Sequence, residues 1–349
     1  MKLLYALQGT GNGHLSRARD IIPLLDKKAE LDVLISGTQA DISLDYPVKY
    51  RLNGLSFVFG KKGGVDLKQT LLRANSRKFI SEITKLPVSQ YDLIINDFEP
   101  VSAWAAKLTG KPCIGLSHQR AVLSPFAPKP KEDDLAGRLI LKNYAPVPAG
   151  YGFHFEAYDP TIYTPVIRQQ IRKALIQDKG HYTVYLPAYD DGRLFNFLSR
   201  FKQVRWEVFS KHNKSAFTLG NVSVRPLNNT AFIESMAASR GILCGAGFET
   251  PAEALYLRKK LLVIPMKNQY EQQCNAAALK KMGVPVIKKL HVKYTDAIYE
   301  WLESQTIIEV NYPDITQQVI DTILHTHLPL STPALPEYLW DKPLRIKPV

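Results

Sequence analysis

The same local pattern occurs twice in this chain and restricts its fold more than any other feature. In each copy an apolar run is followed by a turn that contains glycine and then by a helix pattern. The first copy covers residues 3–25, with its turn at 9–14. The second covers residues 241–258, with its turn at 245–247. Strands that alternate with helices form parallel sheets with helices on both faces.

Both halves of the chain carry this alternation, so the sequence predicts an α/β fold with two doubly wound, Rossmann-like domains. A chain of 349 residues is longer than one typical core supports. We predict a first domain over 1–155, a second over 156–328 and a proline-rich tail over 329–349. Seven prolines between residues 122 and 165 indicate a long functional loop that leads into the linker. The expected strands are 3–7, 32–36, 93–96 and 113–116 in the first half, and 182–186, 206–209, 222–225, 241–244 and 261–265 in the second.

The first glycine turn, Gly9-Thr-Gly-Asn-Gly-His14, does not match the common phosphate-binding turns. It is not a P-loop, because the Gly-Lys-Ser/Thr ending is absent. It fits a dinucleotide fingerprint poorly, because a third glycine would fall at His14 and the next strand ends in Ser36-Gly37 without an acid. Its distinctive feature is the histidine directly after the glycines, at the entrance to a helix expected over 16–25.

The second copy continues into a polar segment that suits a nucleotide-sugar. After the strand come the glycine turn, a helix that Thr250 is expected to cap, a further strand and the polar run Glu271-Gln272-Gln273. Glycines let backbone N–H groups approach an anion, and a helix start adds positive charge there. A carboxylate on the helix and the polar run supply partners for hydroxyl groups. Open parallel sheets bind ligands at the carboxyl ends of their strands, so both turns are expected to face one cleft.

The two turns together with the polar run resemble the nucleotide-sugar glycosyltransferases of the GT-B superfamily, in which two Rossmann-like domains face each other. Within that superfamily the resemblance is to the N-acetylglucosaminyltransferase that forms lipid II and to the UDP-glycosyltransferases of small acceptors. It rests on the Gly-His turn, on Asn96-Asp97-Phe98 as a strand-ending acid, and on Glu271-Gln-Gln-Cys-Asn-Ala276. It runs in pieces from the N-terminus to about residue 283. The chain departs from the pattern at Cys244, where histidine is frequent, and at 187–191, where a Gly-Ser turn is usual.

The resemblance implies that His14 is the general base that deprotonates the acceptor hydroxyl. Asp97 would hold the imidazole and stabilise its protonated form. Glu99 is a rival partner or a rival base. Taken alone, each residue also has a structural explanation, His14 as a residue that bonds the turn backbone and Asp97 as a cap on the helix after it. The implied chemistry is one metal-independent displacement at the anomeric carbon, with inversion of its configuration.

On the donor side the resemblance implies a nucleoside-diphosphate sugar as the substrate, with UDP implied by the resemblance alone, and no further cofactor or metal. Glu253 would bind the ribose diol. Glu249 is the alternative, because Glu253 also fits a capping box with Thr250. The glycine turn would hold the diphosphate, the polar run the sugar, and Phe232 would lie near the base. The predicted donor contacts are Gly11, Asn12, Gly13, Phe232, Gly245, Ala246, Gly247, Phe248, Glu249, Thr250, Glu253, Glu271, Gln272 and Gln273.

Two other functions stay open on sequence grounds. A nucleotide-sugar 2-epimerase of the same fold would need acids near the sugar, for which Glu99 and Glu271 are candidates. A non-catalytic sugar- or anion-binding protein would need no base at all. Asp190 and Asp191 are similar to the metal-binding acids of the other glycosyltransferase fold, but we interpret them as a turn and a helix start.

The charge of the chain bears on its partners. The sequence has 45 Lys and Arg against 32 Asp and Glu, a formal net charge of +13. A basic excess favours a phosphorylated substrate or an anionic membrane face. No recognition motif for nucleic acid accompanies it, so a nucleic-acid partner is not expected. The acceptor is unknown, with lipid-linked and carbohydrate acceptors as candidates, and 57–72 and 122–141 are candidate acceptor or membrane surfaces.

Cysteines and hydropathy bear on the compartment. Cys113, Cys244 and Cys274 have no metal-type spacing and form no even set, which is typical of a reducing environment. No apolar run reaches the roughly 18 residues of a membrane span, and residues 1–7 are too few for a signal peptide. We therefore expect a cytoplasmic protein, with peripheral contact at the inner membrane face as a further hypothesis.

Overall fold

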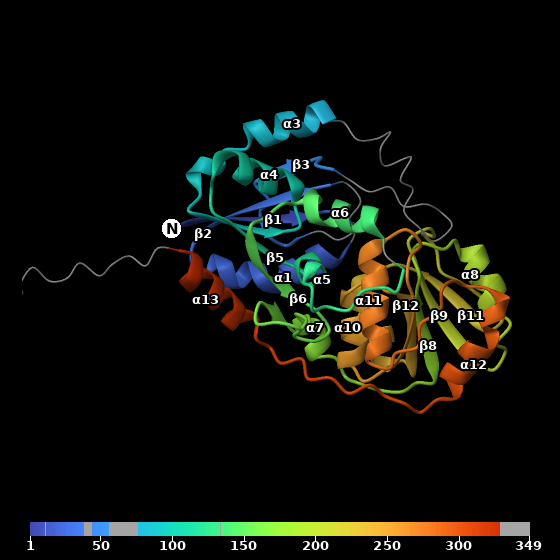
Figure 1. Ribbon diagram of the computed structural model, residues 1–349. Helices are drawn as coiled ribbons and strands as arrows, with labels where there is room; N and C mark the ends of the chain where they lie inside the picture. Colours follow the sequence, from blue (N-terminus) through green and yellow to red (C-terminus); the bar gives the residue numbers. More distant parts are fainter. Residues whose placement is uncertain (11, 38–43, 56–75, 133, 329–349) are drawn as a thin grey trace, which may run out of the picture.

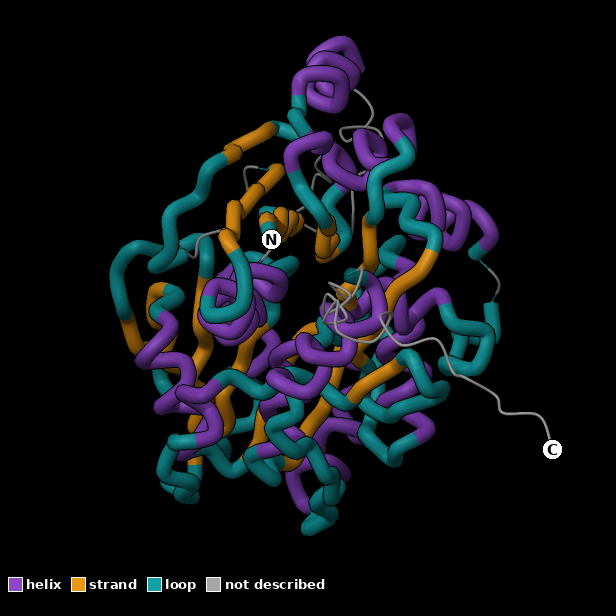
Figure 2. The backbone as a smooth tube through the Cα atoms, turned by 90° about the vertical axis from the view of Figure 1, so that its left-hand side faces the viewer, coloured by secondary structure: helices purple, strands orange, loops and turns teal. Residues whose placement is uncertain are grey.

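The computed structural model of the protein describes residues 1–10, 12–37, 44–55, 76–132 and 134–328. This part of the chain contains two parallel sheets in two lobes that lie side by side (Figure 1). A view turned by 90° shows helices on either side of the strands (Figure 2). The predicted α/β class, with one parallel sheet in each half, is confirmed.

The first sheet has the strand order β3-β2-β1-β4-β5-β6-β7, and all its pairs are parallel. Its strands are β1 (Lys2–Gln8), β2 (Glu30–Ser36), β3 (Tyr50–Leu52), β4 (Leu93–Asp97), β5 (Cys113–Ser117), β6 (Ala149–Phe153) and β7 (Ile162–Tyr163). The strand order reverses between β1 and β4, which places the residues after these two strands at one point of the sheet edge. The connecting helices are α1 (Asn12–Asp26), α3 (Ser76–Lys85), α4 (Pro100–Thr109), α5 (His118–Leu123) and α6 (Leu135–Tyr144), with the 3-10 turn η1 (Val88–Gln90).

The second sheet has the order β10-β11-β9-β8-β12-β13, in which β10 and β11 form the antiparallel pair. Its strands are β8 (His181–Tyr185), β9 (Arg205–Ser210), β10 (Phe217–Leu219), β11 (Val222–Pro226), β12 (Gly241–Gly245) and β13 (Lys260–Ile264). Its helices are α8 (Asp191–Leu198), α9 (Asn229–Ala238), α10 (Glu249–Tyr256), α11 (Tyr270–Lys281) and α12 (Thr295–Glu303), with the 3-10 turn η2 (Val292–Tyr294). Here too the order reverses, between β8 and β12, so the turn after β12 opens at the strand ends that face the other lobe.

The proline-rich segment over 122–165 is not the long loop that its composition predicts. It contains α6 and the last two strands of the first sheet, because the prolines lie between these elements rather than inside them. The first sheet therefore passes the predicted boundary between residues 155 and 156. After it the chain crosses to the second lobe through the short helix α7 (Gln169–Arg172).

The chain returns to the first lobe at its end. Helix α13 (Thr316–His327) lies against α1 (Figure 1). An ion pair of 2.6 Å between Lys28 Nζ and Asp321 Oδ1 joins the two segments at the surface. The predicted tail, 329–349, lies outside the described residues.

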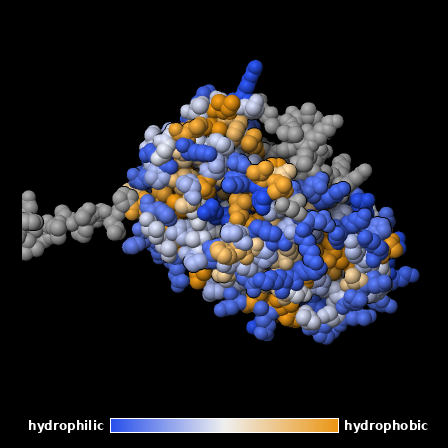
Figure 3. Space-filling view, in the orientation of Figure 1, coloured by the Kyte–Doolittle hydropathy of each residue, from blue (hydrophilic) through white to orange (hydrophobic). Residues whose placement is uncertain are grey.

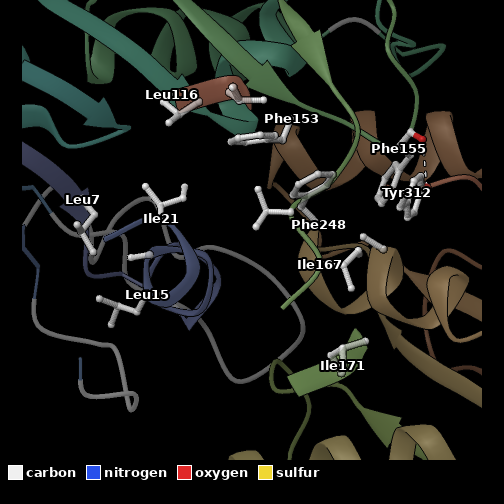
Figure 4. Packing of buried hydrophobic residues seen from close by; sticks show 14 of the residues in the cluster. Leu7, Leu15, Ile21, Leu116, Phe153, Phe155, Ile167, Ile171, Phe248 and Tyr312 are labelled. Carbon is white, nitrogen blue, oxygen red and sulfur yellow. Dashed lines mark hydrogen bonds between the residues drawn. The ribbon is translucent and has the colours of Figure 1, made fainter. Parts of the chain in front are cut away.

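One apolar core cluster spans both lobes and fixes where α1 and α10 stand. Leu15 and Ile21 of α1 pack in it below the first sheet, and Phe248 enters it at the start of α10 (Figure 4). Phe153 and Phe155 belong to the same cluster, and the ring of Phe155 lies 5.2 Å from that of Phe248. Burying a side chain of this size contributes about 1.5–3 kcal/mol relative to leaving it exposed. Packing in this cluster therefore holds the N-terminal ends of α1 and α10 face to face.

Candidate active site

A cleft of about 670 Å³ lies between the two lobes. Its wall in the first lobe is the start of α1, and its wall in the second is the start of α10 together with the ends of β8 and β13. The glycine turns thus face one cleft, as predicted. Of the predicted donor contacts, those that line it are Asn12, Gly13, Phe232, Gly247, Phe248, Glu249, Thr250, Glu253 and Gln272.

His14 stands in the first turn of α1, because this helix begins at Asn12, earlier than the expected start at residue 16. Its Nδ1 lies 2.9 Å from Oδ1 of Asp97, the last residue of β4. An ionised carboxylate only accepts hydrogen bonds, so Nδ1 carries the proton and Nε2 keeps its lone pair. Nε2 lies 3.4 Å from the amide nitrogen of Gln119, beside a smaller cavity of about 110 Å³ that His14 lines. This is the arrangement that a general base requires.

Asp97 is completely buried behind the imidazole. Burial alone would raise the pKa of its carboxyl group, but the positive charge of Arg17 and the contact with His14 lower that pKa below its usual value. Asp97 is therefore ionised at neutral pH. It can orient His14 and stabilise a positive charge on the ring.

Arg17 is a member of this cluster that the sequence reasoning missed. Its Nη2 donates to both carboxylate oxygens of Asp97 at 2.8 Å, and its Nη1 donates to Glu249 at the start of α10. The signal was its position three residues after His14, which places both side chains on one face of the helix. The identity of its partners was not visible, because they lie 80 and 232 residues away.

Glu99 does not fit either role expected for it. Its side chain is completely buried, and its two carboxylate oxygens accept the backbone N–H groups of Val101 and Ser102 at 2.8 and 2.6 Å. It is the N-cap of α4, which Pro100 begins. Burial raises the pKa of its carboxyl group, although these hydrogen bonds oppose the rise. Glu99 is thus a structural cap.

The start of α10 differs from the expected capping box. The helix begins at Glu249, so Thr250 lies inside its first turn, and Phe248 precedes it without a side-chain cap. Glu253 instead pairs with Arg168, which donates to its two carboxylate oxygens at 2.5 and 2.7 Å. The N-cap residue Phe248 thus provides no side-chain cap for the first N–H groups of α10, which lie at the cleft and suit an anion.

The polar run after β13 forms the first turn of α11 rather than a loop. Glu271 accepts a hydrogen bond of 3.0 Å from Gln119 and lines the smaller cavity together with His14. Gln272 accepts from the backbone N–H of Met266, and Gln273 donates to the carbonyl oxygen of the same residue, so both fix the end of β13. Gln272 also lines the main cleft.

Two of the predicted contacts in the glycine turn lie away from the main cleft. Ala246 is completely buried, and its carbonyl oxygen accepts a hydrogen bond of 3.0 Å from Asn275. Gly245 lines a recess of about 90 Å³ beside the cleft. Gly11, in the first turn, lies outside the described residues, as does the whole candidate surface at 57–72.

The smaller cavity is mostly apolar apart from the groups near His14. Its walls include Phe98, Ile140 and Leu141, and Phe98 stacks on Tyr144 with ring centroids 4.8 Å apart. Phe98 has a positive φ of 58°, directly after Asp97, which turns the chain sharply at the end of β4. Near His14, the side-chain amide oxygen Oε1 of Gln119 is buried without a hydrogen-bond partner among the described residues.

His118 is a second histidine at the contact between the lobes, and the sequence reasoning did not single it out. Its ring stacks on Phe248 of α10 at 3.9 Å, and its Nε2 lies 2.7 Å from Oδ1 of Asn275 in α11. Its Nδ1 lies 2.8 Å from the carbonyl oxygen of Phe153. Burial lowers the pKa of its ring, although Glu271 and the carbonyl oxygen of Phe153 oppose the shift. His118 joins the two lobes behind the cleft.

The remaining expectations concern metals, cysteines and the membrane. The described residues contain no group of three or more metal-ligating side chains. Asp190 caps α8 and Asp191 begins it, as interpreted from the sequence. The three cysteines are buried and unbonded, and burial raises the pKa of the Cys274 thiol to about 11. No helix in the described ranges combines the length and hydropathy that crossing a bilayer requires.

Solved structures with the same overall architecture place the chain in a class. MurG of Acinetobacter baumannii is 15% identical over 93% of this chain and 100% of its own, with a TM-score of 0.58. UGT89C1 of Arabidopsis thaliana, solved in complex with UDP, is 12% identical over 94% of both chains, with a TM-score of 0.56. UGT2 of Phytolacca americana, solved with UDP-2fluoro-glucose and pterostilbene, is 12% identical over 94% of this chain and 95% of its own, with a TM-score of 0.54. The fold is thus the two-domain GT-B fold.

The family follows from the sequence itself. Residues 1–304 match the family described as Glycosyl transferase family 1, and the chain belongs to it. Among curated proteins, no sequence matches this chain. The protein is a glycosyltransferase, an enzyme of sugar transfer.

Proposed function

We propose that this enzyme transfers a sugar from a nucleoside-diphosphate sugar, with UDP as the nucleotide, to an acceptor hydroxyl in one inverting step. His14 takes the proton of the hydroxyl on Nε2, and the acceptor oxygen attacks the anomeric carbon opposite the leaving diphosphate. Asp97 holds the imidazole and stabilises its positive charge. The observation that carries the proposal is the contact of 2.9 Å between His14 Nδ1 and buried Asp97, with His14 in the lining of the smaller cavity.

The larger cleft suits the donor. The uncapped N–H groups of α10 meet the diphosphate together with the turn at Gly247, and they stabilise the charge that develops on the leaving group. Glu253 binds the ribose diol while Arg168 holds its carboxylate. Phe232 lines the same cleft and lies near the base. The site then needs no metal ion for the departure of the diphosphate.

The smaller cavity suits the acceptor. It brings His14, Gln119 and Glu271 together, and its lining also includes the apolar side chains of Phe98, Ile140 and Leu141. The Gln119 amide nitrogen lies 3.0 Å from the Glu271 carboxylate and 3.4 Å from His14 Nε2, so it links these two side chains at the proposed acceptor site. A 2-epimerase gains no support from this geometry, since Glu99 is a buried cap.

A titration without metal tests the donor half of this proposal. The protein is titrated calorimetrically with UDP, GDP and dTDP, and the measurement is repeated with Glu253→Ala and with Glu249→Ala. We expect UDP to bind more tightly than the other two nucleotides and Glu253→Ala to weaken its binding more than Glu249→Ala does. Failure of all three nucleotides to bind a folded protein would contradict the proposal.

A second experiment tests the chemistry. UDP-sugars are screened for nucleotide release with panels of lipid-linked and carbohydrate acceptors, and the anomeric configuration of the product is read by NMR. Inversion is expected. Retention, or product formed from the donor sugar without any acceptor, would exclude the single displacement.

A peripheral membrane contact stays a separate proposal, with binding to anionic vesicles as its test. Part of the basic charge of the chain is structural, since Lys259 donates to the carbonyl oxygen of Gln177 at 2.6 Å and Lys260 to that of Leu302 at 2.6 Å. Both lysines are buried. Binding is therefore expected to depend on the other, more exposed lysines and to fall with salt.

A further inference from the structure

The guanidinium of Arg17 lies between two carboxylates that come from the two lobes. Asp97 ends β4 in the first lobe, and Glu249 begins α10 in the second. Arg17 is 2% exposed, and its guanidinium lies 5.8 Å from the centre of the Phe153 ring. A planar guanidinium held on two sides keeps a fixed orientation that a lysine ammonium does not reproduce. Arg17 thus connects the catalytic pair to the donor-binding helix.

Gly13 provides the space in which Glu249 reaches Arg17. The Glu249 carboxylate passes directly over the α-carbon of Gly13, and a methyl group at position 13 would overlap it. Position 13 directly precedes His14. Because glycine has no side chain, the Glu249 carboxylate extends past position 13 and contacts Arg17. By contrast, a methyl group at Gly247 would meet no atom within 4 Å among the described residues.

The charged groups around His14 come from several elements. Arg17 is on the same helix, Asp97 on β4, Glu249 on α10, and Glu271 of α11 is reached through Gln119 of α5. The hydroxyl of Tyr5 on β1 is buried beside Asp97. With a neutral imidazole, Arg17, Asp97 and Glu249 sum to one negative charge. A proton on His14 brings this sum to zero.

We propose that Arg17 is a positioning residue that ties the His14–Asp97 pair to α10, so that Arg17 and Glu249 together set the proton affinity of His14. Its catalytic meaning rests on the proposed function, but the titration of His14 does not. Arg17 lowers the proton affinity of the ring and Glu249 raises it. The two residues therefore act on His14 in opposite directions although they contact each other.

This opposition gives the test. Arg17→Met leaves two carboxylates without their cation, so the pH at which His14 is half protonated should rise by about one unit or more. Glu249→Gln removes one negative charge and should lower this midpoint by about half a unit. Arg17→Lys keeps the charge without the two-sided contact and should give a midpoint between those of the unchanged protein and Arg17→Met. Mere loosening of the fold would not move the midpoint in opposite directions.

The measurement is an NMR titration of the histidine Cε1–H signals in the full chain without nucleotide. The His14 signal is assigned by its loss in His14→Gln. Glu253→Gln is the matched control, because Glu253 stands one turn further along α10 and pairs with Arg168 instead of Arg17. It should shift the midpoint by less than about 0.2 units. If Arg17→Met does not fold, the His14 midpoints of Arg17→Lys and Glu249→Gln are compared instead.

The outcomes separate this inference from the proposed function. Midpoints of Arg17→Met and Glu249→Gln that move in the same direction, or that both stay within about 0.2 units of the unchanged protein, would overturn the inference. Opposite shifts combined with full donor turnover in His14→Ala would keep the inference and reject the base role. In an active enzyme, the acid limb of the pH profile for nucleotide release should follow the NMR midpoint in each variant.

Discussion

Helices α1 and α10 each follow a buried strand and a glycine-containing turn, and the N-terminal ends of the two helices face each other across the cleft. The start of α1 carries an imidazole with a fully buried carboxylate behind it. The start of α10 carries two carboxylates and no side-chain cap. In the proposed function, the same pattern supplies the general base at the start of α1 and the diphosphate contacts at the start of α10. Changes on the α1 side should therefore affect turnover, and changes on the α10 side should affect donor binding.

Removal of the imidazole is the strongest test of this division. His14→Ala should lower nucleotide release from the donor by about 10²–10⁴-fold, the usual contribution of a general base. The affinity for UDP, measured by calorimetry, should stay within about twofold of that of the unchanged protein. His325→Ala, at an exposed position of α13, is the control. An equal loss of UDP binding in His14→Ala would show that the division between the helices is wrong.

Asp97→Asn tests what supports the imidazole, through the stability of the fold. Because the pKa of Asp97 lies below its usual value of 3.8, its ionised form stabilises the fold above that pH and loses this effect as the pH falls through the folded value. The free energy of unfolding should fall by about 3 kcal/mol at pH 7, since the variant leaves Arg17 without its full partner.

Urea denaturation between pH 3 and 7 measures this effect. The unchanged protein should lose stability toward pH 3, and the difference between it and Asp97→Asn should shrink there. Asp45→Asn, at an exposed position, should follow the unchanged protein throughout. A constant difference at every pH would argue against an ionised Asp97.

In α10, the carboxylates of Glu253 and Glu249 have different partners, since Glu253 pairs with Arg168 and Glu249 pairs with Arg17. Glu253→Ala should weaken UDP binding by about 10–100-fold, the loss expected for a hydrogen bond to a charged group. Glu249→Ala should change it less, because its carboxylate faces Arg17. A reversed order would assign the ribose contact to Glu249.

The smallest effect is expected at the glycines themselves. Gly13→Ala should lower the free energy of unfolding by about 1 kcal/mol, because the methyl group displaces the flexible end of Glu249. Gly247→Ala should stay within about 0.5 kcal/mol. In the Glu249→Ala background, Gly13→Ala should cost nothing further. Additive losses in that double variant would show that Glu249 is not what restricts position 13.

Part of this fold was readable from local pattern. Apolar runs bounded by turns located β1, β4, β8 and β12, because a buried parallel strand needs an unbroken apolar stretch. The segment over 122–165 was misread, because prolines mark ends of elements as well as loops. Helix α1 begins at Asn12 rather than at residue 16, and α10 begins at Glu249 rather than after Thr250, because helix ends are the boundaries that local rules fix least well.

For the candidate site, residue types and spacing indicated His14, Asp97 and the glycine turns, but not which side chains reach the cleft. Glu99 and Asp97 stand two residues apart at the end of β4. One side chain turns back to cap α4 while the other points toward α1. Local sequence alone does not separate these two outcomes.

The sequence by itself determined the alternation of strands and helices, the two glycine turns and the family, because these depend on residues that are neighbours along the chain. Only the tertiary structure decided the partners of each charged side chain, because a carboxylate pairs with whatever cation packing brings to it. Arg17, Asp97 and Glu249 meet since one apolar core holds α1 and α10 face to face. Their contact joins the two helix starts to which the proposed function assigns proton transfer and donor binding.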